Sequence, residues 1–104
     1  MKRALWICLL CLVLISLGCI SRHEKPLTEK ELCLQACIAR RDAGSDLSTG
    51  PCLGQIGEDW VCDVAHSPRV EVDDNPDNQC PQYRLGDAHH FVEVTPDCKF
   101  IMQN

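Results

Sequence analysis

The chain has 104 residues, with fifteen acidic and ten basic side chains, a formal net charge of −5 and nine cysteines. A chain of this length fits one small domain. The acidic balance disfavours nucleic-acid binding, because that affinity comes from Lys and Arg side chains that neutralise phosphates.

The N-terminal segment has the layout of an export signal. Basic Lys2 and Arg3 precede an apolar stretch from Ala4 to Leu17. This stretch is shorter than the roughly 20 residues that a membrane-spanning helix needs. We therefore expect residues 1–18 to be a signal peptide that is cleaved. Cleavage would leave eight basic and fifteen acidic side chains, a formal charge of −7.

Cys19 follows the apolar stretch directly. The segment Ile15-Ser16-Leu17-Gly18-Cys19 resembles the lipobox of prokaryotic lipoproteins, in which small residues precede a cysteine that receives a diacylglyceryl group. Two acyl chains anchor a protein stably, whereas one chain binds a bilayer only marginally. We expect lipidation at Cys19 and a location on the extracytoplasmic face of the cell membrane. A secreted product and an uncleaved signal anchor are the alternatives.

The mature chain divides into a polar tether, residues 19–27, and a small cysteine-rich domain, residues 28–104. Its domain contains six cysteines: Cys33, Cys37, Cys52, Cys62, Cys80 and Cys98. An even number of cysteines in an exported domain predicts three disulfides, since disulfides persist in oxidising compartments. Cys33 and Cys37 lie one helical turn apart and are poorly oriented to bridge each other, so each is expected to reach a different downstream cysteine. The sequence leaves the pairing open.

A helix is expected from about Glu29 to Ala43. Thr28 and Glu31 have the spacing of a capping box at its start, and Gly44 can take the left-handed conformation that ends a helix.

Downstream of this helix, the pattern changes to short strands and turns. Alternation predicts a strand over residues 60–66, a brief strand over 70–72, and a hairpin of 89–95 with 99–102. Gly- and Asp-rich segments predict loops over 46–52 and 54–59, and a loop with two prolines is expected over 73–81. The expected fold class is α+β: one N-terminal helix packed on a small antiparallel sheet and held by disulfides.

Histidines and acidic side chains offer the main candidates for a metal site. His66, His89 and His90, with Glu93, form a possible ligand set, which would suit zinc or copper. Such residues also occur as strand and turn residues that hydrogen-bond to backbone, so we rank a metal site second.

Two further kinds of chemistry are weaker candidates. Five oxygen-bearing side chains lie within six residues: Asp73, Asp74, Asn75, Asp77 and Asn78. They lack the order of ligands in an EF-hand, so calcium ranks low. A thiolate nucleophile at Cys62 beside His66 or His89 would leave another cysteine unpaired. We therefore expect no enzymatic activity and no cofactor.

Several short segments resemble a group of short, uncharacterised, exported archaeal proteins. The resemblance rests on Gly50-Pro51-Cys52-Leu53, the segment from Trp60 to Arg69, Asn78-Gln79-Cys80, and the segment from Ala88 to Val94. It implies that these segments belong to one module, and it carries over no site and no activity.

These observations favour a membrane-anchored, extracytoplasmic binding or interaction module. Its partner would be another extracytoplasmic protein or a small ligand, and not a nucleic acid. The alternative is a surface metal-binding protein that uses the histidines.

Overall fold

The computed structural model describes residues 23–104, so the predicted signal peptide, Cys19 and the start of the tether lie outside the described residues. Within this range the chain is α+β, as predicted. Its main elements are helix α2 (Glu29–Asp42) and strands β1 (Cys52–Gly57), β2 (Trp60–Val64), β3 (His90–Val94) and β4 (Phe100–Gln103). Three short helical segments connect β2 to β3: η1 (Glu71–Asp74), η2 (Pro76–Asn78) and α3 (Pro81–Arg84). No helix in this range is long and apolar enough to span a bilayer.

Helix α2 begins and ends as its sequence predicts. The Glu31 N–H donates to Thr28 Oγ1 at 3.3 Å, and the Thr28 N–H donates to Glu31 Oε2 at 2.8 Å, which completes the capping box. Gly44 follows the helix with a φ of +87°. Local chemistry therefore sets both ends of α2.

The sheet is mixed, and the prediction of a purely antiparallel sheet was wrong. Strand order is β1-β2-β3-β4, with β2 and β3 parallel and the two outer pairs antiparallel. A parallel pair requires a crossover connection, and residues 65–89 provide it. The predicted hairpin is confirmed as β3 and β4.

Two local predictions were also wrong. Part of the segment predicted as a loop, residues 54–59, belongs to β1, which pairs with β2 despite Gly54 and Gly57. The brief strand predicted over 70–72 is absent: Val70 precedes the 3₁₀ helix η1, which includes Glu71 and Val72. Asp73 accounts for this turn, because its carboxylate accepts a hydrogen bond from the Val70 N–H at 2.9 Å.

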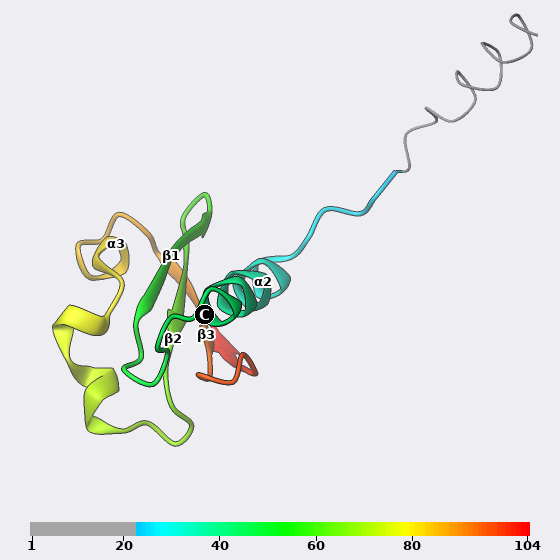
Figure 1. Cartoon of the computed structure of the whole chain (residues 1–104). Helices are drawn as coiled ribbons and strands as arrows, with labels where there is room; N and C mark the ends of the chain where they lie inside the picture. Colours follow the sequence, from blue (N-terminus) through cyan, green and yellow to red (C-terminus); the bar gives the residue numbers. More distant parts are fainter. Residues whose placement is uncertain (1–22) are drawn as a thin grey trace, which may run out of the picture.

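The sheet is covered on both faces by different parts of the chain. Helix α2 covers one face, and the crossover segment with η1, η2 and α3 lies on the other side (Figure 1). The helix side holds the larger core cluster, which includes Cys62, Val64, Val92 and Val94. The largest fully buried side chains are valines and cysteines. This core contains no fully buried large aromatic side chain within residues 23–104, so the cross-links matter for stability.

Three disulfides hold the layers together: Cys33–Cys62, Cys37–Cys98 and Cys52–Cys80. The first two fix α2 to β2 and to the β3–β4 turn, which confirms that Cys33 and Cys37 reach different downstream partners. The third joins β1 to the residue that precedes α3. Each face of the sheet therefore has its own covalent attachment.

Candidate functional site

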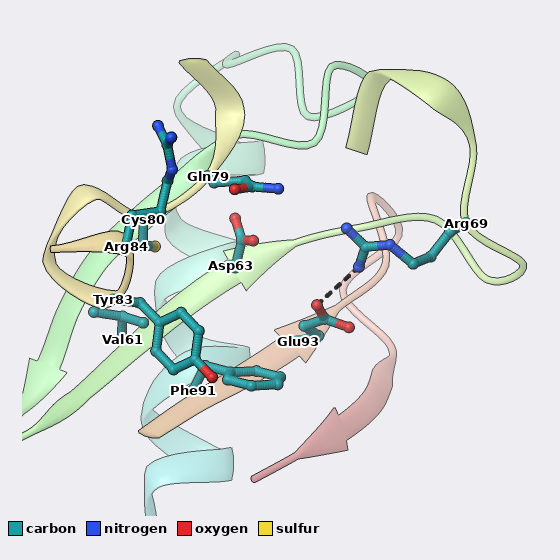
Figure 2. A pocket seen from close by; sticks show the side chains of 9 residues that line it. All are labelled: Val61, Asp63, Arg69, Gln79, Cys80, Tyr83, Arg84, Phe91 and Glu93. Atoms are coloured by element: carbon teal, nitrogen blue, oxygen red, sulfur yellow. Dashed lines mark hydrogen bonds and ion pairs between the residues drawn. The ribbon is translucent and has the colours of Figure 1, made fainter. Parts of the chain in front are cut away.

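A pocket of about 150 Å³ lies between the sheet and the crossover segment, on the face away from α2. Figure 2 shows the nine side chains that line it. Strands β2 and β3 contribute alternate residues, and the remainder come from the crossover. The lining residues are Val61, Asp63, Arg69, Gln79, Cys80, Tyr83, Arg84, Phe91 and Glu93.

Strand register places two carboxyl groups side by side in this pocket. Asp63 on β2 is the direct partner of Glu93 on β3 in the parallel ladder. Side chains of a strand alternate between the two faces, so Val61 and Phe91 share the same face as these carboxyl groups. The pocket is therefore apolar toward Phe91 and acidic toward Asp63 and Glu93.

Asp63 is the most unusual residue of this site. Its Oδ1 atom is buried and has no hydrogen-bond partner within residues 23–104. Burial, and then the negative charge of Glu93, raise the pKa of Asp63 from 3.8 to about 7. A carboxyl with a raised pKa in a pocket is a recognised mark of a functional site.

Glu93, by contrast, has a cationic partner, Arg69. Arg69 Nη1 donates to Glu93 Oε1 at 2.9 Å, and Arg69 Nη2 donates to the Asp73 carbonyl at 3.1 Å. Arg69 Nε and Nη2 also donate to Asp74 Oδ1 at 3.3 and 3.2 Å. All three nitrogens of this guanidinium are therefore occupied, and its charge is shared by two carboxylates.

The opposite wall of the pocket is aromatic. Tyr83 and Phe91 pack edge to face with their ring centroids 5.1 Å apart. Tyr83 is 42% exposed, so this wall is open to solvent. An apolar wall beside a few convergent polar groups is the usual composition of a small-molecule site.

The predicted metal ligands are not brought together by the fold. His66 Nδ1 lies 2.9 Å from Asp73 Oδ1, whereas His89 and His90 both lie beside Asp59, at 2.6 and 3.6 Å. His90 pairs with Trp60 at the start of β2, and His66 follows the end of that strand. Six residues of extended chain place these sites roughly 20 Å apart. Glu93 binds Arg69, and among residues 23–104 no group of three or more His, Cys, Asp or Glu side chains could hold a metal ion.

Several polar side chains of the segment considered for calcium make hydrogen bonds to nearby residues of the chain. The buried Asp73 carboxylate accepts hydrogen bonds from the backbone N–H groups of His66 and Val70. Burial opposes its charge, but these bonds and the His66 ring lower the pKa of Asp73. Asn75 Oδ1 accepts from the Asp77 N–H, and Asn78 donates to the Val72 carbonyl. This segment is a set of capped turns.

Cys62, the candidate nucleophile, has no thiol because it is bonded to Cys33. Cys19, the candidate lipidation site, lies outside the described residues.

Sequence reasoning missed the pocket, although part of its signal was present. Asp63 is the one charged residue within the otherwise apolar strand Trp60–Val64. A carboxyl at such a position is costly to bury without a partner. Its pairing with Glu93 could not be read locally, because the parallel register depends on the long crossover between the two strands.

No protein-family model, curated protein or solved structure matches the chain. The resemblance to exported archaeal proteins therefore stays a prediction.

Proposed function

We propose that this protein is an extracytoplasmic, lipid-anchored module that binds a small ligand in the pocket around Asp63. The observation that carries the proposal is the unpartnered, buried Asp63 oxygen beside an apolar wall. Unsatisfied buried polar groups are rare because each one costs stability. A ligand that completes the hydrogen bonding of Asp63 would compensate this cost.

The scaffold suits such a role. The Cys52–Cys80 disulfide attaches the crossover segment directly beside the pocket, and Cys80 itself is one of the lining residues. Two further disulfides fix α2 on the opposite face. A site held this rigidly loses little conformational entropy when a ligand binds.

The cysteine pairing also supports the lipid anchor. All six cysteines beyond residue 23 are used in pairs within the domain, so none of them remains to bond Cys19. This pairing supports the proposal that Cys19 carries the diacylglyceryl group.

Ligand binding is tested by NMR on the ¹⁵N-labelled exported protein with its disulfides intact, titrated with a library of small metabolites. We expect at least one compound to shift the amide resonances of the pocket strands, notably Val61 and Glu93. Tyr83→Ala, which removes an exposed part of the aromatic wall, should weaken the binding of that compound without unfolding the protein. The proposal fails if no compound shifts these resonances, or if all shifts map to the α2 face.

The anchor is tested separately by replacing Cys19. Cys19→Ser should release the protein into the medium or leave it as an unprocessed precursor. Unchanged membrane fractionation and unchanged processing would refute lipidation.

The metal-binding alternative has no assembled ligand group among residues 23–104, and the two histidines that lie near each other, His89 and His90, are both beside Asp59. Elemental analysis of protein purified without chelator tests it. Stoichiometric zinc or copper that is lost in His89→Ala would establish this alternative, and a metal content unaffected by that substitution would refute it.

A further inference from the structure

Resting on the proposed function of the pocket, we propose that its ligand carries a protonated primary amine, which Asp63 binds while Phe91 and Tyr83 contact the adjoining apolar part. The proposal deepens the assignment from a small ligand to a small organic ammonium ion. Three features of the pocket support it: the Asp63 oxygen without a hydrogen-bond donor, the aromatic wall, and the small volume.

One carboxyl oxygen of Asp63 lacks a hydrogen-bond donor within the described part of the chain. Its buried Oδ1 accepts no hydrogen bond from residues 23–104. A ligand with several N–H donors and a positive charge meets this requirement best, because hydrogen bonds between charged groups are roughly twice as strong as neutral ones. An ammonium group satisfies both conditions.

The two arginines of the lining do not meet this requirement. Every nitrogen of Arg69 donates to Glu93, Asp74 or the Asp73 carbonyl. Arg84 is exposed and does not donate to Asp63 Oδ1, although both residues line the pocket (Figure 2). The inner part of the pocket therefore keeps one carboxyl group without a cationic partner.

The aromatic wall is suited to the same ligand. A cation close to the face of Tyr or Phe is attracted by the ring quadrupole, and the edge-to-face pair of Tyr83 and Phe91 lies at the acidic pocket. The methylene groups next to an amine would contact the same rings. Asp63 and the aromatic pair thus match the two ends of a short alkylammonium ion.

Size and net charge restrict the ligand further. A cavity of about 150 Å³ is as large as an engineered cavity that binds benzene, so it admits a small amine. The chain carries a net charge of −5, and a negative protein attracts cations over a long range.

The test uses three four-carbon probes that differ only in their polar group: butylamine, butyrate and butanol. Each is titrated into the ¹⁵N-labelled exported protein at pH 8, and the shifts of the pocket amides give the dissociation constant. We expect butylamine to bind at least about tenfold more tightly than the other two, and Asp63→Asn to remove this advantage. Asp97→Asn, which neutralises an exposed carboxyl in the β3–β4 turn, is the matched control and should leave butylamine binding unchanged.

A pH series separates ammonium binding from simple apolar contact. Asp63 faces Glu93 and the guanidinium of Arg69 across the strands, with Tyr83 and Arg84 from α3 and the Asp73 carboxylate of η1 nearby. An alkylamine stays protonated to about pH 10, as a lysine side chain does. Butylamine binding should therefore strengthen between pH 6 and pH 8 as Asp63 ionises, and this change should be absent in Asp63→Asn.

Each other outcome overturns the inference. Tighter binding of butyrate would assign ligand recognition to the arginines, and equal binding of all three probes would assign it to the aromatic wall alone. Either result, or a library compound without an amine that binds at Asp63, would leave the proposed ligand-binding function intact. Absence of any pocket shift with the probes and with the whole metabolite library would refute both proposals.

Discussion

Replacing Asp63 with asparagine should stabilise the protein at alkaline pH and leave it nearly unchanged at acidic pH. Asparagine keeps the shape of the carboxyl group and removes its charge. In the folded protein, burial and the charge of Glu93 raise the pKa of Asp63 from 3.8 to about 7. The folded state therefore holds the Asp63 proton more tightly than the unfolded state does.

The sign of the pH effect follows from this difference. The stabilising contribution of the bound proton is complete below the unfolded pKa, near pH 4, and is lost as the pH rises to the folded pKa of about 7. Carboxyls with lowered pKa values, such as Asp73 and Asp59, behave oppositely and lose their contribution only in more acidic solution. Comparing Asp63→Asn with wild type between pH 4.5 and pH 8 isolates Asp63, because titrations that both proteins share cancel.

The magnitude follows from the size of the shift. A difference of about three pKa units corresponds to about 4 kcal/mol, and the remaining exposure of the side chain to solvent reduces this to about 2 kcal/mol. For a domain of this size, 2 kcal/mol raises the melting temperature by roughly 10 °C. Asp63→Asn should show this gain at pH 8 and almost none at pH 4.5.

The assay is urea unfolding, followed by circular dichroism, of wild type, Asp63→Asn and the exposed control Asp97→Asn at both pH values. The control should match wild type throughout. A variant Asp63→Asn that is no more stable than wild type at pH 8 would refute the account of a buried, uncompensated carboxyl. A gain in stability together with a loss of butylamine binding is the combination expected of a residue kept for function.

Three further predictions test the scaffold. Thr28→Ala should cost about 1 kcal/mol through loss of the capping box, and an unchanged urea midpoint would contradict that origin for α2. Gly50→Ala should cost about 2 kcal/mol or more, because φ is +68° and a Cβ atom would lie 2.6 Å from the buried Asp73 Oδ1. Gly44 is the matched control, since its φ is also positive, at +87°, but the space around it is open. Gly44→Ala should therefore cost only about 1 kcal/mol. Equal costs at the two glycines would show that the Asp73 contact is unimportant. Replacing Cys52 and Cys80 together with alanine should lower the free energy of unfolding by about 3.5 kcal/mol, from a loop closed over 28 residues, and an unchanged denaturation curve would contradict a stabilising role for this disulfide.

Features set by neighbouring residues were predictable from the sequence. The capping box of Thr28 and Glu31 defines the start of α2, and the turn around Cys98 joins the two strands of the hairpin. The divergent partners of Cys33 and Cys37 followed from side-chain direction on one helix face. Each of these required only a few consecutive residues.

Features set by distant residues were not predictable. Strand β1 is rich in glycine, and its pairing with β2 overrides the turn tendency of Gly54 and Gly57. The parallel pairing of β2 with β3 depends on how residues 65–89 fold back across the sheet. The pocket depends on this register, since the observed alignment of the two parallel strands places Asp63 beside Glu93.

The positions of the histidines in the fold were likewise not predictable from the sequence. The sequence suggested one ligand set, yet the His66 ring lies beside Asp73 while His89 and His90 lie beside Asp59. The two groups lie at opposite ends of β2.

Direct titration of the Asp63 carboxyl is the most decisive measurement. The ¹³C chemical shift of its carboxyl carbon, followed from pH 3 to pH 9, reports the protonation of this one group. We predict a midpoint near 7 for the ligand-free protein, which should fall when butylamine is added because the ammonium ion favours the ionised carboxylate. A midpoint near 4 that butylamine does not change would contradict an uncompensated carboxyl at the centre of a ligand site.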